Sequence, residues 1–288
     1  MFLIFKTFIN FFLFPYILKY LAKVKALSSI QNPEIKKLRL LFQKKKERKN
    51  QSLFVIEGER EIEKALKGGY LLKSIFIHEA AEHSFEMIIS QSEVSNVFKL
   101  ASSIFERLSI RSGSEKIIAV AQSKTHNLED LILSETSIIL VIEAPEKPGN
   151  IGAIFRTAAA AKIDAVIVAN PKTDFYNPNS IRSSLGSIFL TPTAIGNSLE
   201  VISFLKNKSI CIATAAIHPE AINYNDFDYS TPCAIIMGTE SAGLDSLWLE
   251  KTDQNLIIPM DKDIDSLNLS VSAGILMYEA QRKNKQFE

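Results

Sequence analysis

Cysteine is scarce in this chain, and the two that it contains form no recognisable pattern. Cys211 and Cys233 are the only cysteines among 288 residues, and neither belongs to a CxxC pair or stands near clustered histidines. A disulfide framework and a structural zinc site both need closely spaced ligands. The sequence therefore predicts no bound metal, and it indicates a protein of the reducing cytoplasm.

The chain also lacks an apolar run long enough to cross a membrane. Its most apolar stretch lies between Lys6 and Lys19 and is interrupted by Pro15, whereas a spanning helix needs roughly twenty residues. No A-x-A-like cleavage site of a signal peptide follows. We therefore expect no stable membrane partner and separate residues 1–25 as an N-terminal extension without a role in the fold. A transient membrane association is the alternative.

The net charge of +1 conceals a strong asymmetry along the chain. Residues 1–50 contain twelve Lys and Arg against two Glu, while the remaining 238 residues contain twenty-one against thirty acidic residues. Eight of the cations fall between Lys36 and Lys49, where we expect a helix. This run predicts either the solvated face of an amphipathic helix or a phosphate-binding surface.

The rest of the sequence is rich enough in hydrophobic residues, 47% overall, to form buried cores. Residues 26–122 alternate between helix and strand patterns and predict a small α/β/α sandwich. Its first helix is expected to start at the capping residue Asn32. That helix would bury one apolar face, formed by Ile35, Leu38, Leu41 and Phe42. A strand at Leu53–Ile56 and a helix that stops at Gly68 would follow.

A second α/β domain is predicted for residues 136–288, after a linker at 123–135. Its apolar runs predict strands near residues 137–143, 164–169, 209–215, 233–237 and 255–259. The last stretch, 267–283, predicts a helix. Continuous apolar strands that alternate with helices are typical of a mainly parallel sheet.

Three loops of this second domain follow predicted strands and have unusual compositions. They are "EKPGNIGAIFR", ending at Arg156, "MGTESAGLD" at 237–245 and "IPMDKDIDSLNLSVSAGI" at 258–275. Ligands of open parallel sheets bind at the carboxyl ends of strands. Taken singly, each loop could be an ordinary turn or helix cap. A dinucleotide-binding dehydrogenase is disfavoured, because Gly149 and Gly152 do not have the G-x-G-x-x-G spacing.

Taken together, these loops resemble the three motifs of the SpoU, or TrmH-like, branch of the SPOUT RNA methyltransferases. The first motif corresponds to Asn150–Arg156, the second to Gly238–Leu244, and the third to Ile258–Met260 followed by Ser266–Ser270. The stretch "DFYNPNSIRSSLGSIFLTP" at 174–192 is similar to the family's sequence between the first two motifs. The resemblance covers about residues 26–285. Thr239, Leu269 and Ser272 depart from the usual Asn, Val and Ala of the family, which affects the lining of the site more than its chemistry.

The resemblance implies a trefoil-knotted methyltransferase domain with a parallel sheet, preceded by a small ribosomal-protein-like RNA-binding domain. It also implies a homodimer and transfer of a methyl group from S-adenosyl-L-methionine to a ribose 2′-hydroxyl of RNA. The catalytic candidates carried over from the motifs are Asn150, Arg156, Glu240, Asn268 and Ser270. The candidates for binding the cofactor are Gly238, Ile258, Met260 and Leu267.

Arg156 is the first of these candidates. Since an arginine guanidinium titrates above about 12, stabilisation of a developing alkoxide and a grip on phosphate are chemically easier for it than general-base catalysis. The general-base role that the family suggests stays open. Glu240 would orient Arg156, while Asn268 and Ser270 would bond to the ribose or to Asn150. Gly149 and Gly152 would let RNA approach the backbone.

The RNA itself is expected to bind mainly to the basic run and to one further arginine. These candidate RNA-binding residues are Lys44, Lys45, Lys46, Arg48 and Arg182. The predicted N-terminal domain favours 23S ribosomal RNA as the substrate. Two alternatives stay open: methylation of transfer RNA, and a catalytically silent relative that only binds ribosomal RNA.

Overall fold

The computed structural model describes residues 24–81, 85–92, 94–110, 115–239 and 243–284. The chain divides into two compact units on either side of the Lys124–Thr125 bond, and each is described by itself. Within the described ranges, no helix has both the length and the apolar character needed to cross a membrane.

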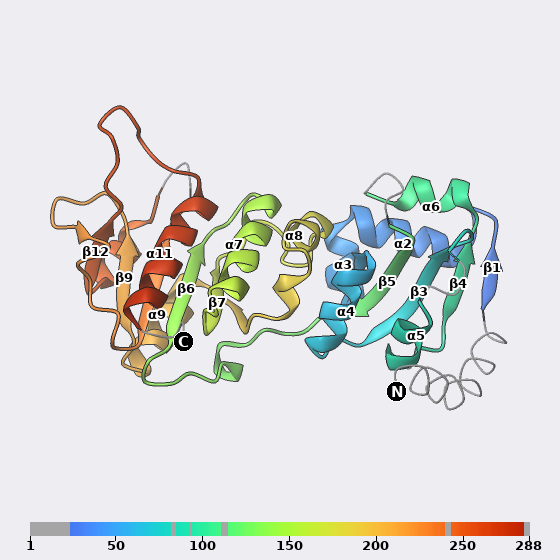
Figure 1. The fold of residues 1–288 in the computed structure, drawn as a ribbon, viewed down its shortest axis with the longest axis horizontal. Coiled ribbons are helices and arrows are strands. Elements are labelled where there is room, and N and C mark those ends of the chain that lie inside the picture. Colours follow the sequence, from blue (N-terminus) through green and yellow to red (C-terminus); the bar gives the residue numbers. More distant parts are fainter. Residues whose placement is uncertain (1–23, 82–84, 93, 111–114, 240–242, 285–288) are drawn as a thin grey trace, which may run out of the picture. The chain divides into compact units, whose positions relative to one another are not determined.

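The first unit is built on a mixed five-stranded sheet with the order β1-β4-β3-β5-β2 (Figure 1). Strand β5 runs antiparallel to β2 and β3, whereas β4 runs parallel to β1 and β3. The strands are β1 (Lys25–Leu27), β2 (Leu53–Glu57), β3 (Leu72–His78), β4 (Val97–Leu100) and β5 (Ile117–Gln122). Residues 1–23 of the predicted N-terminal extension lie outside the described ranges.

Helices cover both faces of this sheet, as the predicted sandwich requires. They are α2 (Pro33–Gln43), α3 (Lys45–Gln51), α4 (Glu59–Lys67), α5 (Glu86–Ser92) and α6 (Ser102–Leu108). Helices α2 and α6 share one apolar cluster with alternate residues of the strands, among them Leu38, Phe76 and Phe105. The Asn32 side chain accepts a hydrogen bond from the Glu34 backbone N–H, so the predicted helix start is confirmed.

The second unit contains a seven-stranded sheet in which every neighbouring pair is parallel, with the order β10-β12-β9-β11-β6-β7-β8. The strands are β6 (Ile138–Glu143), β7 (Ala165–Ala169), β8 (Thr193–Gly196), β9 (Cys211–Ala215), β10 (Ile222–Asn223), β11 (Cys233–Met237) and β12 (Gln254–Ile257). Five of them lie where apolar runs predicted strands. The short edge strands β8 and β10 were not predicted, because their few partly exposed residues form no apolar run.

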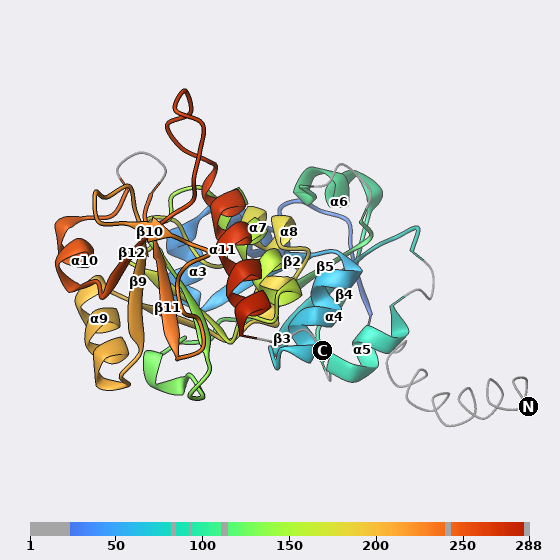
Figure 2. The same ribbon diagram turned by 60° about the vertical axis from the view of Figure 1, so that its left-hand side comes forward.

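Figure 2 shows the helices of this unit on the two sides of its sheet. They are α7 (Pro148–Ala160), α8 (Pro178–Ser183), α9 (Ser198–Asn207), α10 (Ser246–Lys251) and α11 (Leu269–Lys283), with single turns at η1 (Leu128–Asp130) and η2 (Ser187–Phe189). Helices α7 and α11 pack against each other and cover one face. Helices α9 and α10 cover the other and close an apolar cluster that includes Val141, Ile167 and Trp248.

The segment expected as a linker, 123–135, is attached to the second unit along part of its length. The His126 carbonyl accepts a hydrogen bond from Ile195 at the edge strand β8, and Leu131 belongs to the apolar cluster under α9. Leu128 and Leu133 pack against the same cluster. These leucines pack the segment against the second unit, so only a small part of it is a linker.

Candidate active site

The carboxyl ends of three strands of the second unit bring the motif-bearing loops to one edge of its sheet. Strand β11 pairs in parallel with both β6 and β9, and β9 pairs in parallel with β12. Parallel strands end at the same edge. The loops that follow Glu143, Met237 and Ile257 therefore emerge together, as the sequence predicted.

A pocket of about 480 Å³ lies among these loops. All four residues predicted to bind the cofactor line it: Gly238, Ile258, Met260 and Leu267. Further walls come from residues that the sequence did not single out. They are Ala215, Ala216 and Ile217 at and after the end of β9, Leu244 before α10, and Leu249 in α10. The lining is mostly apolar side chains and backbone, which suits a ligand recognised through main-chain hydrogen bonds.

The loop after β11 folds back on itself beside the pocket. Thr239 and Gly243 exchange two backbone hydrogen bonds, each of 3.0 Å. This turn brings the chain so close to Gly238 that a Cβ atom there would lie 2.2 Å from the carbonyl carbon of Gly243. Position 238 therefore accepts only glycine in this backbone arrangement. Glu240, a predicted catalytic residue, lies outside the described residues.

Asn268 and Ser270, which are next in sequence to the pocket-lining residues Leu267 and Leu269, come together with Asn150. Asn268 caps α11, since its Oδ1 accepts bonds from the Ser270 backbone N–H at 3.0 Å and from Ser270 Oγ at 2.6 Å. Its Nδ2 donates to Asn150 Oδ1 at 3.4 Å. Of the two partners expected for Asn268, the ribose or Asn150, the structure contains the second. Its neighbour Leu267 lines the pocket, so the cap joins the pocket to α7.

Helix α7 begins at Pro148, with Lys147 as its cap residue. Proline suits the first helical position because the N–H that it lacks would have no helical partner there. The Asn150 side chain is thereby available to Asn268 instead of capping its own helix. A Cβ on Gly149 would meet nothing within 4 Å, whereas a Cβ on Gly152 would lie 1.9 Å from Ser183 Oγ. Gly152 thus allows α7 to pack against α8, and the expectation that it lets RNA approach is wrong.

Arg156 is exposed on α7, and none of the hydrogen bonds found among the described residues joins it to Asn150, Asn268 or Ser270. Six residues separate Arg156 from Asn150, which at 3.6 residues per turn rotates the two side chains by about 120° from one another. Arg156 and Asn150 of one chain therefore face different directions, although they share a helix.

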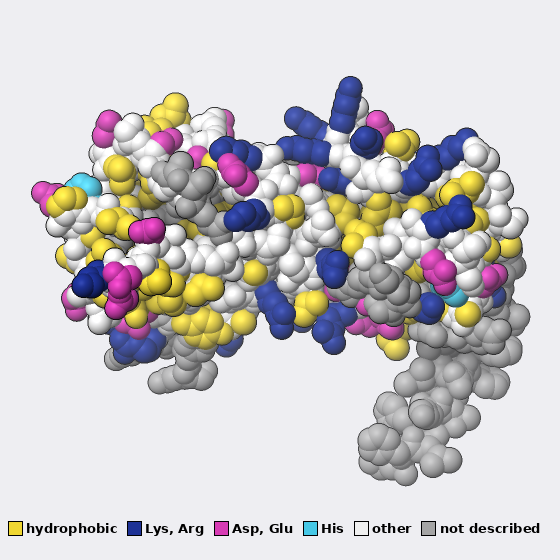
Figure 3. All heavy atoms as spheres, turned by 90° about the horizontal axis from the view of Figure 1, so that it is seen from above, with side chains coloured by type: hydrophobic (Ala, Val, Ile, Leu, Met, Phe, Trp, Pro, Cys, Tyr) yellow, Lys and Arg dark blue, Asp and Glu magenta, His cyan; other side chains and the backbone are white. Residues whose placement is uncertain are grey.

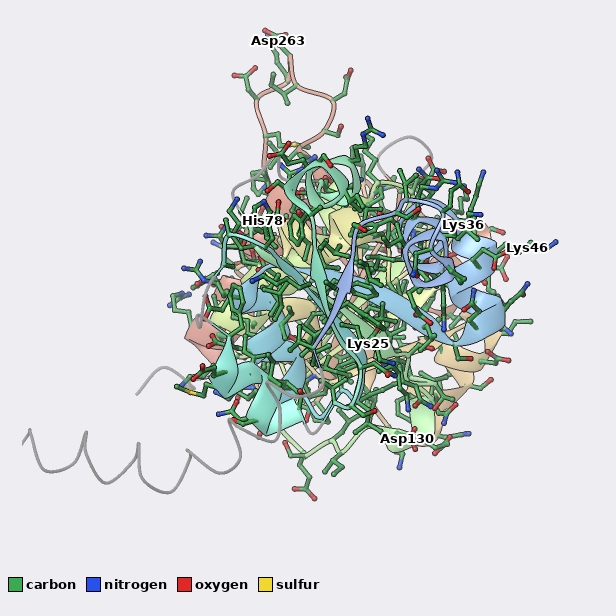
Figure 4. The ribbon with its side chains drawn as sticks, turned by 90° about the vertical axis from the view of Figure 1, so that its right-hand side faces the viewer. Lys25, Lys36, Lys46, His78, Asp130 and Asp263 are labelled. Carbon is green, nitrogen blue, oxygen red and sulfur yellow. The ribbon has the colours of Figure 1, made fainter. Side chains whose placement is uncertain are left out.

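The predicted RNA-binding residues differ in their surroundings. Lys44, Lys45 and Lys46 are exposed at the junction of α2 and α3, and Arg182 is exposed on α8. Figure 4 shows Lys36 and Lys46 extending outward from α2 and α3. The basic run is not one helix, because Lys44 takes an extended conformation (φ −119°) between α2 and α3.

Arg48 is not available to RNA, which corrects the prediction for this residue. It is only 5% exposed, and its guanidinium donates to the carbonyl oxygens of Leu41 at 2.6 Å and Phe42 at 3.1 Å. These carbonyls lie in the last turn of α2, where helical partners are missing. Arg48 therefore closes the end of α2, and the helix break at Lys44 is what turns it inward.

One buried polar cluster of this edge was missed by the sequence reasoning. The Glu143 carboxylate, 6% exposed, accepts hydrogen bonds from Asn170, Ser198 and the indole of Trp248. These residues are distributed over more than a hundred positions of the chain, so no local motif connects them. The one available signal was a glutamate at the end of an otherwise fully apolar strand.

The chain is similar to known proteins over most of its length. Residues 137–278 match the SpoU rRNA Methylase family, and residues 32–119 match the MRM3-like substrate binding domain. The chain is similar to the 23S rRNA (guanosine(2553)-2′-O)-methyltransferase RlmP of Bacillus subtilis, with 32% identity over 88% of this chain and 98% of the relative. It is also similar to the 23S rRNA (uridine(2479)-2′-O)-methyltransferase of Streptomyces viridochromogenes, with 25% identity over 88% and 91%.

Among solved structures, an AdoMet-bound rRNA methyltransferase from Sinorhizobium meliloti superposes with a TM-score of 0.84 and 26% identity, over 90% of this chain and 98% of that one. Fold and site define an RNA 2′-O-methyltransferase that depends on S-adenosyl-L-methionine. The chain belongs to the SpoU rRNA methylase family, with a substrate-binding domain in its first unit.

The pocket fits the cofactor of this family. Its volume of about 480 Å³ lies within the range of roughly 300–1,000 Å³ that small-molecule sites occupy. Gly238, Ile258 and Leu267 line it, together with the apolar residues Leu249 and Met260. S-adenosyl-L-methionine supplies an activated methyl group on a sulfonium, so the chain's own residues have to position the acceptor and manage its proton.

Proposed function

We propose that this enzyme methylates the ribose 2′-hydroxyl of a nucleotide in 23S ribosomal RNA. The relatives named for 23S rRNA support the substrate, since each matches 88% of this chain. One of them is named for a guanosine and the other for a uridine. Ribosomal RNA as substrate and the sparse cysteines both favour a cytoplasmic enzyme.

One observation carries the assignment of the reacting site. Leu267 lines the cofactor pocket, and the next residue, Asn268, bonds to Asn150 on α7. The walls that would hold the methyl donor and the helix of the first motif are thus connected through adjacent residues. A hydroxyl held near Asn150 would lie at the edge of the pocket, which is the proximity that methyl transfer requires.

In the reaction, the ribose 2′-oxygen forms a bond to the methyl carbon, the carbon–sulfur bond breaks, and the sulfur leaves with the bonding pair as a thioether. The hydroxyl proton would pass to solvent water, or to Arg156 if that residue acts as the base. Asn150, Asn268 and Ser270 would hold the ribose by hydrogen bonds, and Arg156 would stabilise the negative charge that develops on the oxygen. Glu240 is proposed to orient the Arg156 guanidinium. A role for Arg156 as the base is the alternative.

A homodimer would reconcile the position of Arg156 with this role. Within one chain Arg156 and Asn150 point about 120° apart along α7, as their spacing requires. Arg156 can act at such a site if it reaches the pocket of a second copy of the chain. We therefore propose that the active enzyme is a homodimer in which Arg156 acts across the interface. The trefoil knot implied by the family resemblance stays a prediction.

The first unit would supply the phosphate contacts. Lys44, Lys45 and Lys46 are exposed there, and Figure 3 shows Lys and Arg side chains gathering over the surface of this unit. Each phosphate that a cation neutralises releases counterions, so such contacts bind RNA strongly at low salt. Arg182 in the second unit would add a contact on the catalytic domain.

The direct test combines cofactor binding with methyl-group mapping. Calorimetry should detect binding of S-adenosyl-L-methionine, and 2′-O-methyl mapping of total RNA from cells with and without the gene should reveal one site that disappears from 23S RNA. A site lost from transfer RNA instead would identify the alternative substrate. Cofactor-free protein that binds ribosomal RNA, with no site lost, would identify the catalytically silent relative.

A further inference from the structure

The Glu143 carboxylate connects the two halves of the proposed reaction site. It ends β6, the strand that leads through the loop at 144–147 into α7 with Asn150 and Arg156. Its Oε2 accepts the indole N–H of Trp248 at 2.9 Å, and Trp248 lies in α10. Helix α10 directly follows the loop that contains Gly238 and Gly243 at the cofactor pocket.

Two further donors complete the surroundings of this carboxylate. Ser198 Oγ, in the first turn of α9, donates to Oε2 at 2.8 Å. Asn170 Nδ2, just after β7, donates to Oε1 at 2.9 Å and also to Ser198 Oγ at 2.6 Å. Glu143, Asn170 and Ser198 therefore form a closed ring of hydrogen bonds. The Trp248 indole donates to the same carboxylate from outside this ring.

A role in filling the core does not account for a carboxylate at this position. Glu143 is 6% exposed and Trp248 is fully buried, and no salt bridge to Glu143 is found among the described residues. Removing a carboxylate from water is costly, and an apolar side chain of similar size would fill the space at lower cost. What the carboxylate provides is two oxygens that accept three neutral donors from three separate segments: the residue after β7, the first turn of α9, and α10.

The bond to Trp248 also determines how the cofactor loop ends. Asp245 caps α10 by accepting a hydrogen bond from the Trp248 backbone N–H at 3.2 Å. Trp248 is thus held at its backbone by the end of the loop and at its indole by Glu143. A shift of the indole would move Asp245 and, through it, the turn that closes on Gly238.

We infer that Glu143 is a positioning residue, which fixes the loop before α7 and the loop between β11 and α10 relative to one another through Trp248. This inference rests on the proposed function for its effect on catalysis, but its effect on cofactor binding can be measured separately. Misplacement of a reacting group by about 1 Å costs roughly a hundredfold in rate. Loss of the connection should therefore affect both cofactor affinity and turnover.

The side-chain geometry predicts a graded series of variants at this position. In Glu143→Gln, the single carbonyl oxygen can still accept from Trp248 and Ser198, and only the bond to Asn170 has to rearrange. Glu143→Leu removes every acceptor, and Trp248→Phe removes the indole donor while keeping a buried ring. We expect the Kd for S-adenosyl-L-methionine to rise about tenfold in Glu143→Leu and Trp248→Phe, and less than about threefold in Glu143→Gln.

Trp248 is the only tryptophan of the chain, so its fluorescence reports on this contact directly. Wild-type emission should change as S-adenosyl-L-methionine is added, and the midpoint of that titration should move with the Kd of the Glu143 variants. Calorimetry gives the Kd for Trp248→Phe, and circular dichroism below the melting temperature confirms that each variant is folded. The methylation rate at saturating cofactor then separates kcat from cofactor affinity.

Gln281→Met is the matched control. Gln281 is fully buried in α11, and its Nε2 donates to the Lys162 carbonyl at 3.1 Å, near the carboxyl ends of α7 and α11. Its loss should change stability without changing cofactor affinity. The inference is overturned if folded Glu143→Leu and Trp248→Phe bind S-adenosyl-L-methionine with the wild-type Kd. If cofactor affinity falls as expected but wild-type protein methylates no RNA, the positioning role stands and the proposed function fails.

Discussion

The first unit, residues 1–124, contains 21 Lys and Arg against 12 Asp and Glu, whereas the second, residues 125–288, contains 12 against 20. Their formal net charges are therefore +9 and −8. The loop at 258–268 contributes to the negative charge of the second unit, with Asp263 at its extended tip (Figure 4). An acidic domain attracts RNA poorly, because phosphate contacts require cations. The charge contrast supports the proposal that RNA affinity comes mainly from the first unit and methyl-transfer chemistry from the second.

The largest expected effect concerns Arg156. An effect of this residue on RNA affinity, and not on kcat, would contradict the proposed division of roles between the two units. Arg156→Ala should lower kcat about a hundredfold or more, because the charge opposite the developing oxyanion is lost. The Kd for S-adenosyl-L-methionine should stay near the wild-type value. Methyl incorporation at saturating RNA and cofactor measures the effect, with Lys206→Ala, an exposed cation of α9, as the control. A kcat equal to wild type would exclude the assigned role.

Gly238→Ala tests whether the second unit binds cofactor through its backbone. The added Cβ would lie 2.2 Å from Gly243, so the turn must move, at a cost of about 2 kcal/mol. If that cost appears in binding, affinity for S-adenosyl-L-methionine falls roughly thirtyfold. Gly149→Ala, whose Cβ meets nothing within 4 Å, should leave cofactor affinity unchanged. Calorimetry on both variants decides, and equal affinities would contradict the steric argument.

The basic surface of the first unit should control RNA affinity alone. The double variant Lys44→Ala/Lys46→Ala should raise the KM for RNA about tenfold at moderate salt and reduce the slope of log K against log salt by up to about 2. Cofactor affinity should not change. Lys67→Ala/Lys73→Ala removes two exposed cations of the same unit from α4 and β3 and serves as the control. Equal losses in both double variants would indicate only a nonspecific effect of net charge.

The smallest expected effect is a pH dependence confined to the first unit. Burial of the His78 ring, and next the charge of Lys116, lower the pKa of this histidine below its usual 6.5. The folded state then binds fewer protons than the unfolded state, so stability is complete above pH 6.5 and declines as the pH falls below it. We therefore expect a small loss of stability between pH 6.5 and pH 5.

Two signals distinguish the units in that experiment. Circular dichroism follows both units, whereas Trp248 fluorescence follows the second alone, since the chain has one tryptophan. Acidification from pH 7.5 to 5 should lower the denaturation midpoint followed by circular dichroism more than the midpoint followed by Trp248 fluorescence. His78→Asn, whose side-chain oxygen can still accept from the Ala80 backbone N–H as His78 Nδ1 does, should reduce the shift. If the midpoint of His78→Asn falls as much as that of the wild type, groups other than His78 cause the pH dependence.

The regular elements followed from local patterns to a large extent. The Asn32 cap, the stop at Gly68 and the five apolar strands of the parallel sheet are all present. Patterns failed at β8 and β10, whose partly exposed residues form no apolar run. The break at Lys44 was also missed, because the cationic run continues through it and only the contact of Arg48 with the end of α2 reveals the second helix.

The candidate site was predictable to the extent that it depends on local motifs. All four residues expected to bind the cofactor line one pocket, and Asn268, Ser270 and Asn150 meet as neighbours. The remaining walls at Ala215–Ile217 and the contacts of Glu143 could not be predicted. They depend on which strands lie side by side, and no local stretch of sequence determines the order of the strands in a sheet.

The sequence by itself determined the elements, the charge contrast between the units and the motifs, because these depend on residues near one another along the chain. Tertiary structure alone decided which side chains face the site. It turned Arg48 inward, assigned Gly152 to helix packing, and joined Glu143 to Trp248 across 105 positions of the chain. Such contacts depend on burial and on the pairing of distant strands, which only the folded chain establishes.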